Sequence, residues 1–172
     1  MWFWPGVIVA LAISWLLAPA VARVLRTERL TAWFLLFSIG LVLAAVATPI
    51  RPPVGLDLAI QRPCDLGRRW FATFPEITAL TDVTMNIGIY LPAGVAIAML
   101  PISRRSAVAV AGVIALPAFV EALHYGVPVL GRGCQSADAI DSLTGLAIGL
   151  LAGGAVRLVR RAWAGLRAWT RR

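Results

Sequence analysis

The sequence predicts an all-α, polytopic membrane protein, a single helical bundle of about five transmembrane helices over residues 1–172. Of these residues 60% are hydrophobic and 14% are charged, whereas about a quarter of a soluble domain is charged. Mean hydropathy is +0.83. The basic residues are all Arg, and the net charge is +8. Because Arg beside membrane spans explains this charge, we expect no nucleic-acid partner.

Apolar segments account for most of the chain, and each is long enough to cross about 30 Å of hydrocarbon as a helix of roughly 20 residues. The third segment gives the weakest signal because polar residues lie toward its start. The connections are an outer loop over 51–81 and a basic cytoplasmic tail over 160–172. The expected spans are 2–22, 31–50, 82–100, 107–125 and 139–159.

The first apolar segment ends in Ala18-Pro19-Ala20, which is typical of a signal-peptidase site. A secretory signal, however, has basic residues before its apolar region. Here no charged side chain precedes Trp2, and Arg23 and Arg26 follow the segment. We therefore expect a retained anchor with the N-terminus outside.

The distribution of Arg predicts the rest of the topology. The first loop, the third loop and the tail together hold eleven Arg, and the other two loops hold five. Since positive residues collect on the cytoplasmic side, we expect a multi-pass protein of the cell membrane with the N-terminus outside and the C-terminus in the cytoplasm.

The two cysteines, Cys64 and Cys134, fall in the loops that this topology places outside. An oxidising compartment permits a disulfide there. We expect the bridge to form. Two unpaired thiols are the alternative, because sequence alone gives no geometry.

The second half of the long loop has helical spacing of apolar residues, preceded by Arg68 and Arg69. This pattern predicts a short amphipathic segment at the outer interface. It acts either as a lid over a site below or as an aromatic anchor. The residues concerned are Trp70, Phe74, Ile77 and Thr81.

Polar residues within or beside the last three spans are the candidate ligand-binding residues. Ionisable groups at membrane depth are costly, so they are usually functional or paired. Spacings of three or four place them on common helix faces in the outer half of the membrane, with Arg132 as their expected counterion. The alternative is an interfacial or self-paired cluster that fixes helix packing. The candidates are Asn86, Glu121, His124, Arg132, Asp138 and Asp141.

Proline and glycine in the same spans suggest how the helices pack. Pro92 and Pro117 fall in mid-span, where kinks would open a pocket toward the outside. Gly145, Gly149 and Gly153 recur every four residues. Such a stripe permits close helix packing, either against a neighbouring helix or against a second copy of the chain in an oligomer.

Three motifs occur in order over roughly residues 80–153: NIGIYLPAG at 86–94, VEALH at 120–124 and DAIDSLTGLAIG at 138–149. Together they resemble the VanZ-like family of integral membrane proteins. His124 stands where the family tends to have Gln, and Ser142 where it tends to have Asn. The resemblance implies a bacterial cell-envelope protein of the kind associated with resistance to teicoplanin-type antibiotics.

The favoured function is non-catalytic binding of an amphiphile, either a lipid-linked wall precursor or a lipoglycopeptide, at an outer-leaflet polar pocket. The alternative is a membrane-embedded enzyme that uses Glu121 and His124, with Asp138 or Asp141, for acid/base or metal-dependent chemistry on a lipid phosphate or ester. We expect no metal site and no cofactor, since the chain has one His. Membrane lipids are the expected partners.

Overall fold

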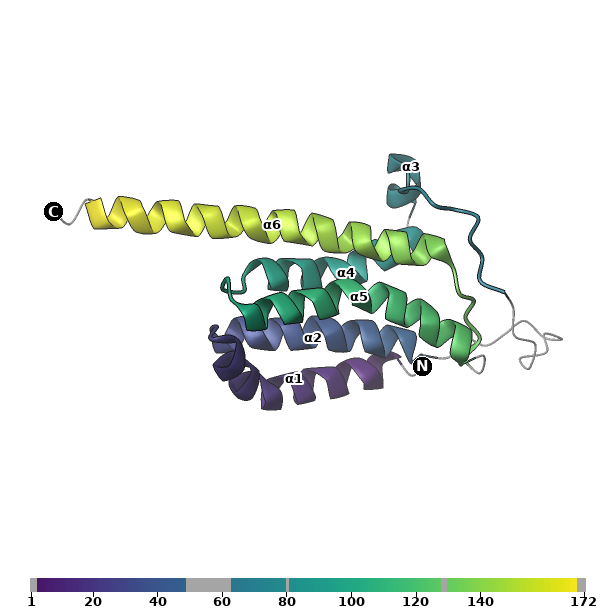
Figure 1. The fold of residues 1–172 in the computed structure, drawn as a ribbon, viewed down its shortest axis with the longest axis horizontal. Coiled ribbons are helices and arrows are strands. Elements are labelled where there is room, and N and C mark those ends of the chain that lie inside the picture. The colour runs from purple at the N-terminus through teal and green to yellow at the C-terminus, as the bar shows by residue number, and fades with distance from the viewer. Residues whose placement is uncertain (1–2, 49–62, 80, 128–129, 170–172) are drawn as a thin grey trace.

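The computed structural model describes residues 3–48, 63–79, 81–127 and 130–169. This part of the chain is built of helices, which confirms the all-α class (Figure 1). The predicted start at Trp2, the end at Ile50, Arg51 and Arg62 of the long loop, and the last three residues lie outside the described ranges. The helices are α1 (Phe3–Leu25), α2 (Arg29–Val46), α3 (Phe74–Thr78), α4 (Asp82–Ala98), α5 (Arg104–Gly126) and α6 (Ser136–Trp169).

Four of these helices, α1, α2, α5 and α6, are long and apolar enough to cross a membrane. The weakest expected span is α4, an apolar helix of 17 residues. It lies within the bundle beside the longer helices (Figure 1). The chain is therefore a multi-pass membrane protein, and each of the five expected spans corresponds to a helix of the bundle.

The two ends of the bundle differ in chemistry. At one end α4 and α6 begin and α5 finishes, and Cys64 is joined to Cys134. We call it the disulfide end. At the opposite end are the α1–α2 turn, the α4–α5 turn and the last turns of α6, with most of the described arginines. We call it the arginine end.

The first two helices form an antiparallel hairpin with small side chains at its interface. Ala18, Ala32 and Ser38 are completely buried. A Cβ atom built on Gly40 would lie 2.7 Å from the Cβ of Ala10, so the two backbones approach closely there. The Ser38 hydroxyl donates to the carbonyl of Phe34 at 2.7 Å, which satisfies a polar group at a buried position.

Helix α4 lies between α2 and α6, and its contact with α6 is the most extensive in the bundle. Cβ atoms built on Gly145 and Gly149 would overlap the carbonyl oxygens of Ile87 and Leu91. The glycine stripe of α6 therefore packs against α4 of the same chain, the first of the two arrangements that the sequence allows. Any contact with a second copy would need another surface.

Ser103 is the N-cap of α5, because its hydroxyl accepts a hydrogen bond from the Ser106 N–H at 3.1 Å. Both α4 and α5 continue through their internal prolines, Pro92 and Pro117. Pro117 is fully buried. Membrane helices tolerate such prolines where neighbouring groups satisfy the freed carbonyl.

Helix α6 has 34 residues, which corresponds to a length of about 50 Å at 1.5 Å per residue. That exceeds the roughly 30 Å of a hydrocarbon core. Figure 1 shows its C-terminal part extending past the other helices at the arginine end. The basic residues of this extension include Arg160 and Arg161, both exposed. The helix therefore crosses the membrane and continues beyond it.

Candidate functional site

Polar side chains gather at the disulfide end, where α4, α5, α6 and the long loop meet. Several of them are buried: Asp141 is 0% exposed, Ser142 5%, His124 6% and Glu121 8%. Ionisable groups inside a membrane bundle face its interior and have a functional or pairing role. We call the following set the polar cluster: Arg68, Tyr90, Glu121, His124, Asp138, Asp141 and Ser142.

The disulfide fixes the long loop against the start of α6. Cys64 and Cys134 are bonded, with their Cα atoms 4.7 Å apart, as the sequence predicts. Next to the bond, Asp65 and Gln135 form a parallel bridge. Its hydrogen bonds run from the Asp65 N–H to the Cys134 carbonyl and from the Ser136 N–H to the Asp65 carbonyl, each at 2.9 Å. The residues that follow Cys64 are thus held across the first turn of α6.

Arg68 is the counterion of Asp141. Its Nη2 donates to Oδ2 of Asp141, and the two side chains are 18% and 1% exposed. The Arg68 backbone is held in turn, because the Ser136 hydroxyl donates to its carbonyl at 2.6 Å. A buried carboxylate is tolerated only with such compensation. The loop therefore supplies the charge that Asp141 requires.

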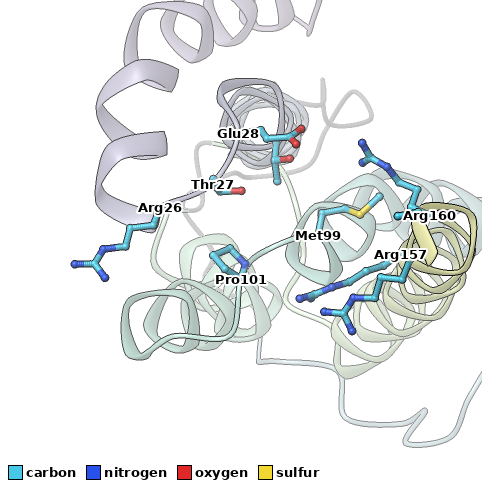
Figure 2. A pocket seen from close by; sticks show the side chains of 10 residues that line it. Arg26, Thr27, Glu28, Met99, Pro101, Arg157 and Arg160 are labelled. Atoms are coloured by element: carbon cyan, nitrogen blue, oxygen red, sulfur yellow. The ribbon is translucent and has the colours of Figure 1, made fainter. Parts of the chain in front are cut away.

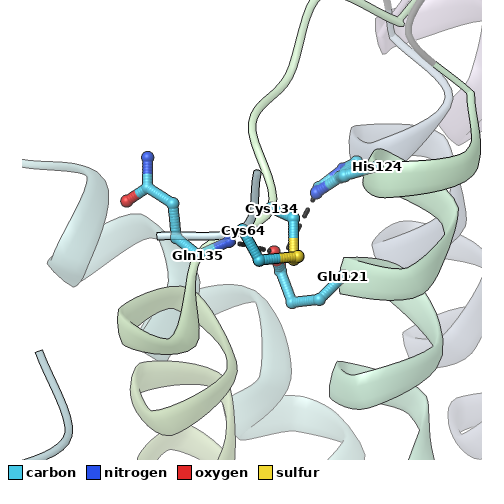
Figure 3. The surroundings of a disulfide bond; sticks show 5 residues. All are labelled: Cys64, Glu121, His124, Cys134 and Gln135. Carbon is cyan, nitrogen blue, oxygen red and sulfur yellow. Dashed lines mark hydrogen bonds and ion pairs between the residues drawn. A yellow bond between two sulfur atoms is a disulfide. The ribbon is translucent and has the colours of Figure 1, made fainter. Parts of the chain in front are cut away.

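Glu121 and His124 form a second pair, on the last turns of α5 (Figure 3). Nδ1 of His124 lies 3.5 Å from Oε1 of Glu121, within ion-pair range but without hydrogen-bond geometry. The other carboxylate oxygen, Oε2, accepts the backbone N–H of Gln135 at 2.8 Å. Since Gln135 directly follows Cys134, the disulfide also positions the group that binds Glu121.

Several buried polar atoms of the cluster have no hydrogen-bond partner among the described residues. They are both ring nitrogens of His124, Oδ1 of Asp141 and Nη1 of Arg68. The Tyr90 hydroxyl interacts with the side chain of Ser142. Buried polar atoms in native proteins nearly always have a partner, which can be protein, water or ligand. Both donors and acceptors are therefore available at this end of the bundle for the polar groups of another molecule.

Two of the remaining sequence candidates, Asp138 and Asn86, lie at the disulfide end, and the third, Arg132, makes a different contact. Asp138 is half-buried and interacts electrostatically with Glu121, Asp141 and Asp82. Asn86 is half-buried on α4, one turn before Tyr90 and on the same face. Both belong to this end of the bundle.

Arg132 differs from expectation. Its Nη2 donates to the carbonyl of Ala45 near the end of α2, at 3.2 Å. Arg132, the predicted counterion, thus connects its loop to α2, and Arg68 is the counterion of Asp141 instead. Arg132 lies in a short loop whose path the sequence does not determine.

Sequence reasoning did not select Arg68, Tyr90 or Ser142 as site residues. The signal for Arg68 was present, because a Cys64–Cys134 bond places the residues after Cys64 beside those after Cys134. Tyr90 is one turn beyond Asn86 on α4. Ser142 follows Asp141, and its side chain is turned inward by the same helix face that buries Leu146.

Of the segment predicted over Trp70 to Thr81, only Phe74–Thr78 forms a helix, α3, and Trp70 and Thr81 lie outside it. The Thr84 hydroxyl on α4 donates to the carbonyl of Ile77 at 2.6 Å and holds α3 near the start of α4. The aromatic side chains of Trp70, Phe71 and Phe74 are 64–78% exposed. This exposure favours the role of an interfacial anchor over that of a lid.

Within the described ranges, no group of three or more His, Cys, Asp or Glu side chains is close enough to hold a metal ion. The cluster is nonetheless rich in carboxylates. Four carboxylates lie in or near the cluster, and among the described residues one guanidinium, that of Arg68, pairs with one of them, Asp141. The four are those of Asp82, Glu121, Asp138 and Asp141. The arrangement suits hydrogen-bond acceptance more than anion binding.

No family model, no curated protein and no solved structure matches the chain.

Proposed function

We propose that the polar cluster binds the polar head of an amphiphile from the outer leaflet and that the protein acts in the bacterial envelope as a binding protein. The observation that carries this proposal is the set of unpartnered buried atoms on Arg68, His124 and Asp141. They lie on the long loop and on two helices, α5 and α6, at one end of the bundle. A ligand head that enters between these helices would satisfy them.

The chemistry of the cluster constrains the ligand. Its carboxylates accept hydrogen bonds and repel anions, so the recognised part of the ligand supplies hydroxyl, amide or ammonium donors. A bare phosphate would meet Glu121 and Asp138 at close range. The sugar and peptide groups of a lipid-linked wall precursor, or those of a lipoglycopeptide, carry the required donors.

The disulfide supports an assignment of the two ends of the bundle to the two sides of the membrane. Structural disulfides persist in oxidising compartments, so the end with Cys64 and Cys134 faces outside in this proposal. The concentration of Arg at the opposite end supports the same orientation. In the proposed orientation the N-terminus is outside and the C-terminus is in the cytoplasm.

The motif resemblance also supports an envelope role. Asn86, Glu121, His124 and Asp138 belong to the three motifs that resemble the VanZ-like family, and all four lie at the disulfide end. We therefore include teicoplanin-type resistance in the proposal, with a lipoglycopeptide as one of two probes.

The test is a titration of the purified full-length protein in detergent with teicoplanin and, separately, with a synthetic lipid-linked disaccharide pentapeptide. Glu121→Gln keeps the side-chain volume and still accepts the Gln135 N–H. It removes the charge, so we expect at least about tenfold weaker binding of the probe, the effect of one charge-assisted hydrogen bond. Glu76→Gln, the same change at an exposed residue of α3 outside the polar cluster, is the matched control.

Two results would overturn the proposal. If each probe bound the wild type, Glu121→Gln and Glu76→Gln with equal affinity, the cluster would be excluded as the binding site. Conversion of the lipid probe to a product by the wild type, with conversion lost and binding retained in Glu121→Gln, would establish the enzyme alternative, in which the Glu121–His124 pair performs acid/base chemistry.

A further inference from the structure

A pocket of about 550 Å³ lies at the arginine end, far along the bundle from the polar cluster. It is formed by the α1–α2 turn, the α4–α5 turn and the last turns of α6 (Figure 2). Its polar lining includes Arg26, Glu28, Thr31, Arg157, Arg160 and Arg161. Four arginines thus line the pocket together with one carboxylate, and in Figure 2 the side chain of Arg26 points away from Arg157 and Arg160.

The arginines come from different elements, and one of them is fixed by the backbone. Figure 2 shows Arg157 and Arg160 on α6 at one side of the pocket, and Glu28 at the other. Nη1 of Arg157 donates to the carbonyls of Ala98 and Leu100, at 3.2 and 3.0 Å. This side chain is therefore held in place at the end of α4, before any ligand binds.

The pocket also contains a strained backbone position. Arg26 has φ +54°, in the left-handed region where glycine is favoured. The next residue, Thr27, donates its N–H to the carbonyl of Ala22 at 3.0 Å, which closes the end of α1. An arginine at this position costs stability, and such cost is often found at functional sites.

The chemistry of this lining selects a phosphate group. Guanidinium groups match phosphate oxygens in charge and in planar two-point geometry. Thr27 and Thr31 add hydroxyl donors. Basic pockets between transmembrane helices at the membrane surface bind anionic lipid head groups in this way.

An apolar groove next to the pocket indicates that the phosphate belongs to a lipid. Thr31 lines the basic pocket and Leu35, one turn further along α2, lines an apolar groove of about 400 Å³ between α1, α2 and α5. Val24 and Leu25, just before Arg26, line the same groove. A phosphate held near Thr31 would leave acyl chains beside these apolar surfaces.

We infer that the arginine-end pocket is a binding site for the phosphate group of an anionic phospholipid. The site is independent of the polar cluster at the disulfide end. It uses the exposed Arg160 and Arg161 of α6 with the α1–α2 turn, and it connects the extension of α6 to the membrane surface.

The experiment uses native mass spectrometry of the full-length protein in detergent, with dioleoylphosphatidylglycerol and dioleoylphosphatidylcholine at matched concentrations. Arg160→Gln/Arg161→Gln removes two exposed charges of the pocket. Arg23→Gln/Arg104→Gln removes two exposed charges at the same end but outside the pocket. Arg157 is left unchanged because it holds the end of α4.

We expect phosphatidylglycerol to bind in preference to phosphatidylcholine. The pocket variant should weaken its binding at least about tenfold, the combined effect of two cations at a lipid surface, and the control variant should leave it near the wild-type value. Inorganic phosphate in millimolar excess should not displace the lipid. Equal losses in the two variants, or no preference for the anionic lipid, would overturn the proposal. Binding of inorganic phosphate without any lipid binding would show that the pocket binds free phosphate and not a phospholipid.

Discussion

Arg68 pairs with Asp141 across 73 residues of sequence, and the disulfide four residues before Arg68 holds the loop in position for this contact. Asp141 is the most deeply buried acid that the structure describes, with a side chain 1% exposed. A carboxylate in that position needs a cation, and removing one partner of a buried ion pair is strongly destabilising. The loop is thus part of the folded core.

Arg68→Gln should lower the free energy of unfolding by about 3–5 kcal/mol, because it leaves the Asp141 charge unpaired. Asp141→Asn should cost less, and Arg68→Gln/Asp141→Asn should be close to Asp141→Asn alone. Thermal unfolding in detergent measures all three. Arg69→Gln is the control, since Arg69 is exposed and its Nε donates to the Leu66 carbonyl. Simple addition of the two single losses would show that the pair is not coupled.

Reduction of the Cys64–Cys134 bond should release the long loop and weaken the Arg68–Asp141 and Gln135–Glu121 contacts. A bond that closes so long a segment contributes about 2–4 kcal/mol to stability. We expect a lower melting temperature with reductant or in Cys64→Ser/Cys134→Ser. Mass spectrometry after alkylation without reductant should detect no labelled cysteine. Labelling of both cysteines would contradict the disulfide.

Gly149→Ala should destabilise the bundle by about 1–3 kcal/mol, because a Cβ atom there overlaps the Leu91 carbonyl and forces α4 and α6 apart. Gly154→Ala, in the same helix, is the matched control. A Cβ atom at Gly154 meets nothing within 4 Å, and alanine is the better helix former. Its melting temperature should equal or exceed that of the wild type. Equal melting temperatures for the two variants would mean that this helix contact is not tight.

The short helix α3 should lose order at acid pH. Hydrogen bonds from the backbone N–H and the hydroxyl of Thr73 to the Glu76 carboxylate lower its pKa below the ordinary 4.5. A lowered acid pKa stabilises the folded form above pH 4.5, and this contribution is lost as the pH falls through the folded-state pKa.

Hydrogen exchange of the amides at 73–78, compared at pH 7 and below pH 4 after correction for intrinsic rates, tests the α3 prediction. Glu76→Ala should remove the protection at pH 7 and abolish its pH dependence. Glu76→Gln, which retains an acceptor for the capping box, should keep part of it. Protection that is the same at both pH values in the wild type would contradict the role of the carboxylate.

The helices were predictable because their signals are local. Apolar length locates α1, α2 and α5 within a few residues, and even the weaker α4 begins at Asp82 as expected. The small-residue spacing of α6 predicted close packing, though not which helix would fill it. Gly145 and Gly149 leave space for a neighbouring backbone, but the sequence does not specify which helix occupies that space.

The site was predictable only in part. Glu121, His124 and Asp141 stand out because charge is rare in apolar helices. Their partners depend on loop paths, which hydropathy does not encode. Arg68 and Arg132 are both outer-loop arginines in the sequence, yet one meets Asp141 and the other meets the carbonyl of Ala45. Charge and order along the chain cannot distinguish them.

The glycine stripe also determines how far α6 can slide. Gly145, Gly149 and Gly153 meet Ile87, Leu91 and Val95, each pair one helical turn beyond the last. A shift of α6 by a single residue would place larger side chains against those backbone positions. A shift by four residues, about 6 Å along the axis, would bring Asp141 or Arg157 to one of them. The glycine stripe therefore permits one axial register of α6 against α4. The same interface fixes the position of Asp141 at the disulfide end and that of Arg160 at the arginine end.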